Sequence, residues 1–341
     1  MSDPGRITLA HGAGGRAMHA LIEELLVPAF GGAPEVLEDQ ARLSPPGLTA
    51  PGARLALTTD SFVVTPRLFP GGSLGTLAVA GTVNDLCVGG ARPHALTCAL
   101  ILEEGLPLTE LRRVVDDLAT TARRADVRIV TGDVKVVERG AADGLYVNTT
   151  GVGVIPPGRD PSCAALRPGD RILVTGPVGD HGAAIAAARG TFGIETALQS
   201  DCRPLASLVE TLFEHGPRVR ALRDATRGGV ATVLNEFARA SRCAIRVEED
   251  AVPVREAVRG FAELLGLDPL YLANEGTLVM AVAPDDADAA LAALHAHTDG
   301  RGAAVIGEVL PAPAGRVTQG GGFGGERVLD VLAGDQLPRI C

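Results

Sequence analysis

Hydrophobic positions recur along the chain with the period of strands in some stretches and of helices in others. A run of two prolines and a glycine at 156–158 separates two groups of such stretches. In the first group, the pattern predicts helices over 17–30, 73–88 and 108–124 and strands over 53–59, 94–102, 127–138 and 144–155. We expect the first helix to end near Pro28, and the glycine in Thr131-Gly132-Asp133 to break the third of these strands.

In the second group, the pattern predicts strands over 171–175, 244–247, 277–282 and 303–309 and helices over 205–215, 230–240, 254–265 and 285–297. The glycine run 320–325 is expected to be a hinge or a hairpin before 327–332. A chain of 341 residues exceeds one ordinary core, so we predict an α/β (α+β) protein with two domains, 1–155 and 156–332. The tail 333–341 has few apolar side chains, and we expect it to be mobile.

The composition describes a globular protein with an aliphatic core. Hydrophobic residues make up 46% of the chain and mean hydropathy is +0.21, whereas aromatic residues contribute only 3%. A net charge of -10 argues against nucleic acid or an anionic membrane surface as the main partner. A phosphorylated ligand would therefore have to be held by metal ions and backbone amides. The chain shows neither a signal-peptide pattern nor an apolar run long enough to cross a bilayer, so a cytoplasmic protein is expected.

The cysteines also fit a reducing compartment. The six of them are scattered, without a Cys-x-x-Cys pair or zinc-like spacing, and Cys87 and Cys98 lie in apolar surroundings typical of a core. Cys341 is the last residue, and its position alone leaves a reactive carrier thiol and an idle terminus equally open. Arg339 would lower the pKa of this thiol and the terminal carboxylate would raise it.

Two glycine-rich segments precede expected helices. Gly12, Gly14 and Gly15 lie in His11–Arg16, which suits either a phosphate at a helix start or a simple capping turn. The second segment, 176–182, has the spacing Gly-x-x-Gly-x-x-Gly, which differs from the dinucleotide-binding fingerprint, and we reject that fold. His181 in this segment is expected to be a cap or loop residue, with no catalytic role.

Two acidic residues of the first domain lie in unusual places, one at the end of a predicted strand and one inside an apolar predicted helix. Asp60 follows the strand 53–59 and Asp85 lies inside the apolar helix 73–88. A buried acid has to be paired or metal-bound, and two such acids suit Mg²⁺; a capping Asp60 and a hydrogen-bonded Asp85 are the alternative. Asp133 and Lys135 share a strand face, either as part of a phosphate–metal site or as an ordinary cross-strand ion pair.

The second domain offers two further acids. Asp224 precedes Thr226, Arg227 and two glycines at the start of the helix 230–240, a position for an anion or a metal, or for a helix cap. Asn274-Glu275-Gly276 precedes the strand 277–282.

Five blocks together resemble the ATP-dependent superfamily of aminoimidazole ribonucleotide synthetase. They are Thr59–Ser61, Gly81–Asp85, Thr131–Lys135, Asp224–Gly229 and Asn274–Gly276, in order along nearly the whole chain. The opening His11–Arg16 and the closing Pro338–Cys341 resemble the HypE family within it. Selenophosphate synthetases need a cysteine or selenocysteine in the opening glycine loop, which is missing here, and the superfamily's small-molecule enzymes have no use for a terminal cysteine.

The resemblance implies a fold and a set of site residues. The fold has two α/β domains, and the N-terminal domain pairs into a β-barrel in a homodimer, with ATP and Mg²⁺ near that interface. Metal ligands would be Asp60, Asp85, Asp133 and Asp224, and cofactor-binding residues would be Gly12, Gly14, Gly15, Asn84, Lys135, Asp224 and Asn274.

The same resemblance implies a function. A HypF-like carbamoyltransferase would load Cys341, ATP would drive dehydration of the S-carbamoyl group to a thiocyanate, and the cyanide would pass to iron on a HypC–HypD-like complex for nickel–iron hydrogenase. Glu275 is the candidate base and Lys135 the candidate for charge stabilisation, although these roles can be exchanged. The tail would swing about 320–325 or Gly334. The alternatives are a nucleotide-binding scaffold that presents Cys341 without chemistry, and another ATP-dependent synthetase of the superfamily.

Overall fold

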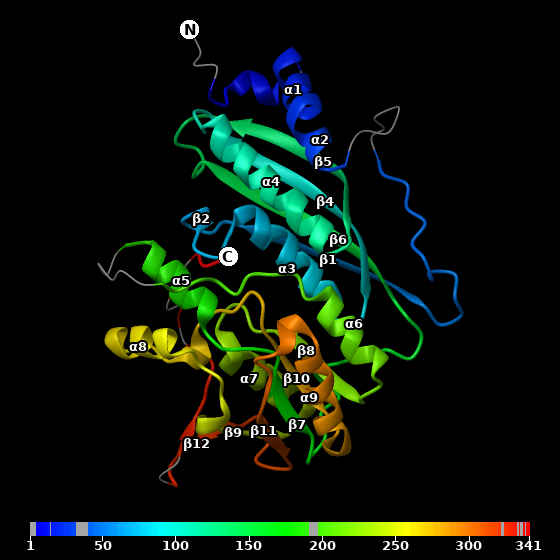
Figure 1. Ribbon diagram of the computed structural model, residues 1–341, viewed down its shortest axis with the longest axis vertical. Helices are drawn as coiled ribbons and strands as arrows, with labels where there is room; N and C mark the ends of the chain where they lie inside the picture. Colours follow the sequence, from blue (N-terminus) through cyan, green and yellow to red (C-terminus); the bar gives the residue numbers. More distant parts are fainter. Residues whose placement is uncertain are drawn as a thin grey trace.

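Two layered halves stack along the long axis of the molecule, and the C-terminus lies where they meet (Figure 1). The structure is a computed structural model, and it describes residues 5–13, 15–31, 40–190, 197–321, 324–332, 334, 337 and 339–341. Among these residues, no helix combines the length and the apolar character that a membrane span requires.

A four-stranded sheet forms the N-terminal half. Its order is β1-β6-β4-β5, with β4 and β5 parallel and the other pairs antiparallel. The strands are β1 (Arg54–Phe62), β4 (Arg92–Glu103), β5 (Arg128–Val137) and β6 (Leu145–Ile155). Side chains of β1 alternate, so Thr58 and Asp60 are partly buried while Leu55 and Leu57 are 51% and 66% exposed on the other face. This open apolar face suits the expected barrel-forming dimer, which stays a prediction.

Helices α3 (Leu74–Val88) and α4 (Leu108–Arg124) cover the other face of this sheet (Figure 1). Ser73 caps α3 by accepting a hydrogen bond from the Thr76 N–H, and α3 is buried along most of its length because it packs on the sheet, on α4 and on the C-terminal half. The two helices approach so closely that a Cβ on Gly75 would lie 2.2 Å from the Val114 carbonyl oxygen. The predicted apolar face of α4 is buried as expected.

A seven-stranded sheet of order β13-β12-β9-β11-β7-β10-β8 forms the C-terminal half. Its strands are β7 (Arg171–Val174), β8 (Val219–Asp224), β9 (Ala244–Glu248), β10 (Leu278–Val282), β11 (Ala304–Leu310), β12 (Val317–Gly320) and β13 (Glu326–Val328). Helix α7 (Gly229–Ser241) contacts several of these strands, whereas α6 (Ala206–Glu214) contacts α9 (Ala287–Ala296) and also α3. One hydrophobic core runs from α3 and α4 into α6, β10 and α9, so the two halves share a core.

Shorter elements complete the described chain. They are 3-10 turns Leu9–Gly12, Glu249–Ala251, Pro269–Tyr271, Pro284–Asp286 and Thr298–Gly300, helices α1 (Arg16–Leu21), α2 (Val27–Ala29), α5 (Asp180–Ala188) and α8 (Glu256–Leu265), and the strands β2 (Leu68–Phe69) and β3 (Gly72–Ser73). A π-helical turn, Ile22–Leu26, joins α1 to α2, so the helical stretch predicted over 17–30 is present.

Of two expectations about glycine, the structure corrects one and leaves part of the other open. The break expected at Thr131-Gly132-Asp133 is absent, because the β4–β5 register shifts just before it and Gly132 lets the strands approach; a Cβ there would lie 2.1 Å from the Cys98 carbonyl oxygen. β12 and β13 pair as a hairpin, with Gly321 donating to the Gly325 carbonyl, which agrees with the hairpin that the sequence left open; a hinge at 320–325 stays a prediction. Residues 322–323 lie outside the described residues.

The end of the tail is packed against the body. Ile340 is only 4% exposed and belongs to the shared core, with Leu337 and Cys341 packed against it. The expectation that the tail has too few apolar side chains to be held in a core is therefore wrong for its last residues. Residues 333, 335, 336 and 338 lie outside the described part of the chain, and a hinge at Gly334 stays a prediction.

Candidate active site

Two carboxyls of the N-terminal half lie between β1 and α3. The alternation of β1 places Thr58 and Asp60 on the face toward α3, and Asp85 reaches them from α3. The Thr58 hydroxyl donates to Asp85 Oδ2 at 2.8 Å, and Asp60 Oδ1 accepts from the Ser61 N–H at 2.7 Å. Burial raises the pKa of Asp85, the Thr58 hydrogen bond offsets part of this rise, and the Asp60 charge adds to it.

Two carboxyls of the C-terminal half face the same region, Asp224 at the end of β8 and Glu275 just before β10. Burial, followed by repulsion from Asp85, raises the pKa of Asp224 to about 6. The pKa of Glu275 is raised well above its usual range, first by burial and then by the charges of Asp224, Asp201, Asp60 and Asp85. We call Asp60, Asp85, Asp224 and Glu275 the acid cluster: it concentrates negative charge between the two halves.

Glu275 is the most enclosed member of the acid cluster. It is 4% exposed, and its buried Oε1 has no hydrogen-bond partner among the described residues. The Asp201 carboxylate fixes the backbone here, accepting from the Glu275 N–H at 2.9 Å and the Gly276 N–H at 3.0 Å. Only glycine fits at 276, because a Cβ would lie 1.9 Å from the Asp201 carbonyl oxygen. Asp201 was missed by the sequence analysis, since no motif or element includes it.

The acid cluster fits a divalent cation only in part. In the described ranges, no group of three or more His, Cys, Asp or Glu side chains is close enough to hold a metal, so the metal role of Asp60, Asp85, Asp133 and Asp224 stays a prediction. Mg²⁺ commonly takes one or two carboxylates and completes its shell with phosphate oxygens and water. Repelling carboxyls with raised pKa values, of which Glu275 keeps an unpartnered oxygen, suit that mode of binding.

Asp133 and Lys135 lie apart from the acid cluster. They are on β5, at the opposite edge of the sheet from β1. Lys135 Nζ lies 2.7 and 2.5 Å from the two Asp133 oxygens, and this hydrogen-bonded contact lowers the pKa of Asp133. The structure therefore has the ion pair that the sequence left open, made within one strand, and a common site with Asp60 inside one chain is not formed.

The two candidate asparagines serve as internal braces. Asn84 Nδ2 donates to the Arg203 carbonyl at 3.1 Å and the Glu275 carbonyl at 3.4 Å, and its Oδ1 accepts from the Leu205 N–H at 2.8 Å. These bonds tie α3 to the segment that carries Glu275.

Asn274 is fully buried. Its Oδ1 accepts from the Gly179 N–H at 2.7 Å, while its Nδ2 donates to the carbonyls of Ala225 and Leu272 at 3.0 and 3.1 Å. The geometry favours a structural role for both asparagines, and cofactor binding by them stays a prediction.

Gly12, in the N-terminal glycine-rich segment, lies against β5. A Cβ on Gly12 would approach the Val136 backbone nitrogen to 2.7 Å, so packing against β5 accounts for this glycine. Gly15 is the residue before α1 and has open space around it, while Gly14 lies outside the described residues. A phosphate-binding role for this loop is untested.

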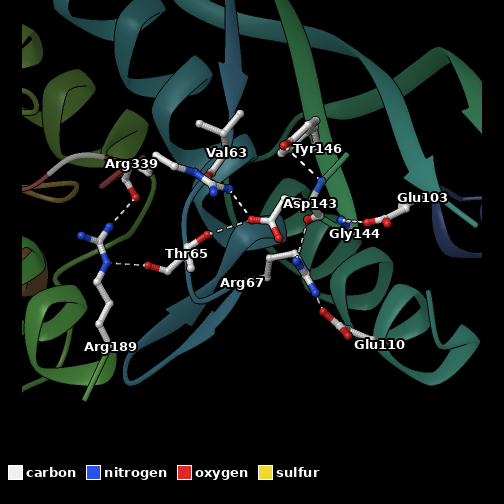
Figure 2. A network of polar contacts seen from close by, with 10 residues as sticks. All are labelled: Val63, Thr65, Arg67, Glu103, Glu110, Asp143, Gly144, Tyr146, Arg189 and Arg339. Atoms are coloured by element: carbon white, nitrogen blue, oxygen red, sulfur yellow. Dashed lines mark hydrogen bonds and ion pairs between the residues drawn. The ribbon is translucent and has the colours of Figure 1, made fainter. Parts of the chain in front are cut away.

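The chain end is seated along residues 63–65, directly after β1. The Val63 N–H donates to the Cys341 terminal oxygen at 3.2 Å and the Thr65 N–H to the Arg339 carbonyl at 3.4 Å. The Arg339 side chain donates to the Val63 carbonyl and, at 2.6 Å, to Asp143 Oδ2 (Figure 2). The tail therefore places Cys341 directly after β1, the strand that carries Asp60.

His181, expected to be a cap or loop residue, lies in the first turn of α5 with 0% exposure. Its Nε2 is 2.8 Å from the Ile340 carbonyl oxygen, so it contacts the tail. The sequence analysis missed this role because only the docked tail gives the buried imidazole its partner.

Comparisons with known proteins agree with the two-domain fold. Residues 38–155 match the family model for the AIR synthase related protein, N-terminal domain, and 167–320 match that for its C-terminal domain. A carbamoyl dehydratase HypE of Rhodobacter capsulatus is 54% identical, covering 98% of each chain. A crystal structure of HypE in complex with ATP has a TM-score of 0.91 at 48% identity, covering 98% of this chain and 99% of that one. A HypE–HypF complex has a TM-score of 0.79 at 44% identity, covering 82% and 90%.

Proposed function

The chain belongs to the AIR synthase related family and, within it, to the HypE proteins; from this membership we propose that it dehydrates an S-carbamoyl group on its own Cys341. The reaction uses ATP, yields a protein thiocyanate, and supplies the cyanide ligand of the iron in nickel–iron hydrogenase. The single observation that carries the proposal is the seating of Cys341 directly after β1, the strand that brings Asp60 to the acid cluster.

The chemistry explains why ATP is needed. A thiocarbamate, S–C(=O)–NH₂, does not lose water readily, because hydroxide is a poor leaving group. Transfer of the γ-phosphoryl group of ATP to the carbamoyl oxygen, with loss of one N–H proton, releases ADP and leaves an imidate, in which phosphate is the leaving group. Loss of the remaining N–H proton, with departure of phosphate, then leaves S–C≡N. The first step depends on positioning and the second on a base.

The acid cluster supplies candidates for both needs. Mg²⁺, held by Asp85 and Asp224, would neutralise phosphate charge when bound. Glu275 is the candidate base, because its Oε1 is buried and unpartnered beside the other acids of the described chain. Lys135, which lies apart from the acid cluster at the opposite edge of the sheet, stays the candidate for charge stabilisation, and it would have to leave Asp133 in order to act. The two roles can still be exchanged.

The proposal includes partners and a compartment. A HypF-like carbamoyltransferase would load Cys341, in keeping with the HypE–HypF complex of a similar protein. A HypC–HypD-like complex would accept the cyanide, and the working unit would be a homodimer. No disulfide links the six cysteines, all of which lie in the described part of the chain, and this supports the reducing cytosol.

Intact mass spectrometry of the carbamoylated protein, before and after ATP is added, tests the proposal. Loss of one water, localised to Cys341, is expected. An unchanged mass would contradict the proposal and favour the scaffold that presents Cys341 without chemistry.

A further inference from the structure

Three contacts fix the ring of His181: one with Phe69, one with Ser200 and one with Ile340. Its ring packs edge-on against Phe69, with ring centroids 5.7 Å apart and planes at 85°. Nδ1 lies 2.8 Å from Ser200 Oγ and Nε2 lies 2.8 Å from the Ile340 carbonyl oxygen. A buried imidazole with both nitrogens engaged has one orientation, and here that orientation points at the backbone of the tail.

The partners of His181 also determine where its proton lies. The Ile340 carbonyl oxygen can only accept, so Nε2 carries the hydrogen and donates it. Burial lowers the pKa of His181 to about 4, so the ring is neutral, Nδ1 accepts, and the donor is the Ser200 hydroxyl. Ser200 Oγ in turn accepts from the Cys202 N–H at 3.0 Å, which turns its hydrogen toward the imidazole. This series of hydrogen bonds, from the Cys202 N–H to the Ile340 carbonyl, fixes the neutral tautomer that carries its hydrogen on Nε2.

A second side chain from the same part of the molecule fastens the tail. Arg189 follows α5 directly, and its guanidinium donates to the Thr65 carbonyl at 2.9 Å and the Arg339 carbonyl at 2.7 Å (Figure 2). His181 and Arg189 therefore take the carbonyls of two successive tail residues. Both contacts are made to the backbone, directly before Cys341.

We propose that His181, oriented by Ser200, is a positioning residue that holds the Ile340 carbonyl and thereby keeps Cys341 seated against residues 63–65, directly after the strand that carries Asp60. Arg189 assists it at the preceding carbonyl. This inference rests on the proposed function for its catalytic consequence, while the seating itself can be tested without it.

The proposal has a signature that a merely structural histidine would lack. Dehydration needs the thiol seated, whereas any reagent or enzyme that loads the thiol needs it released. Weakening the His181–Ile340 hydrogen bond should therefore slow dehydration and speed modification of the thiol. A histidine that only stabilises α5 would lower the melting temperature and leave both rates unchanged.

The test is the rate at which iodoacetamide alkylates Cys341 in the full-length protein, followed by peptide mass spectrometry. His181→Ala should raise this rate about 3- to 10-fold, the effect of losing one hydrogen bond. His181→Gln, which keeps an N–H donor, should restore part of the protection. The matched control is His295→Ala. His295 lies on α9, and its ring also bonds a backbone carbonyl, that of Ala303. Equal alkylation rates in wild type, His181→Ala and His295→Ala would overturn the proposal.

A second measurement separates this inference from the proposed function. In protein carbamoylated to completion beforehand, single-turnover dehydration with ATP should be slowed by His181→Ala in about the proportion by which alkylation is accelerated. If wild type forms no thiocyanate, the proposed function fails and the alkylation rates still decide whether His181 seats the tail. If His181→Ala does not fold, Ser200→Ala decides: faster alkylation supports the proposal, and an unchanged rate overturns it.

Discussion

We call the residues that hold the end of the tail the seat of the tail: Val63, Thr65, Asp143, His181 and Arg189. The acid cluster, which includes Asp60 of β1, and the seat, which begins directly after β1, are built in opposite ways. In the seat, charged and polar groups have hydrogen-bond partners. The Arg339 side chain donates to Asp143 and lowers its pKa, and the carbonyls of Arg339 and Ile340 accept from Arg189 and His181. In the acid cluster, burial and mutual repulsion raise the pKa values of Asp85, Asp224 and Glu275, and Glu275 keeps a buried oxygen without a partner among the described residues. The seat can thus hold the cysteine by itself, whereas the cluster is suited to binding positive charge.

The largest expected effect comes from the base. Glu275→Gln should slow single-turnover formation of the thiocyanate by at least about 100-fold, because an amide cannot accept the carbamoyl proton. Mass spectrometry of quenched reactions measures the rate. Glu263→Gln, at an exposed position of α8, is the control. If the Glu275→Gln protein reacted at the wild-type rate, Glu275 would not be the base.

The second effect concerns stability below neutral pH. Burial lowers the pKa of His181 to about 4, from 6.5. Between these pH values the unfolded chain binds more protons than the folded one, so the stability due to neutral His181 is complete above about pH 6.5 and is lost as the pH falls toward 4. The loss should be on the order of 3 kcal/mol in urea unfolding, and His181→Gln should remove it. An identical pH profile in both proteins would contradict the assignment.

Asp224 should show the opposite sign in nearly the same range. Because its pKa is raised to about 6, the folded chain holds the proton longer, and stability falls as the pH rises through 6. Asp224→Asn should raise the free energy of unfolding at pH 7.5 by about 1–2 kcal/mol, since the side chain is partly exposed, and should weaken ATP binding. Asp285→Asn, an exposed change, is the control. A destabilised Asp224→Asn protein would mean that the cluster is not repulsive.

The smallest effect is expected at the rim of the seat. Asp143→Asn removes a half-exposed ion pair with Arg339, worth about 0.5 kcal/mol, and should raise Cys341 alkylation about 2-fold. Asp330→Asn, which removes the exposed pair with Arg239, should leave the alkylation rate unchanged. If Asp143→Asn raised the alkylation rate of Cys341 more than His181→Ala did, the Arg339–Asp143 ion pair would hold the tail more strongly than the His181–Ile340 hydrogen bond, which would contradict the account.

Much of this comparison was accessible from the sequence, and the reasons differ by region. Periodicity predicted α4 and β6, since each buries one regular face, but it did not predict β8 or β12. An acid inside the apolar helix 73–88 correctly indicated that Asp85 needs a polar partner, which is Thr58. Distance across the sheet was inaccessible: only strand order shows that Lys135 and Asp60 lie at opposite edges.

The seat of the tail could not be predicted, because every contact in it joins residues far apart in the chain. The His181–Ile340 and Arg339–Asp143 bonds span 159 and 196 positions. A short apolar tail also gives no local sign that Ile340 enters a core shared by both halves. The bracing by Asn84 and Asn274 could not be predicted for a related reason, since their amide groups bond to the backbone of distant segments.

The most direct test of the account follows the carbamoyl oxygen. Cys341 would be loaded with a carbamoyl group labelled with heavy oxygen, and the phosphate released after addition of ATP would be analysed by mass spectrometry. The account predicts one heavy oxygen in each inorganic phosphate, because the carbamoyl oxygen leaves bonded to phosphorus. Unlabelled phosphate, formed while the thiocyanate appears, would contradict phosphorylation of the tail.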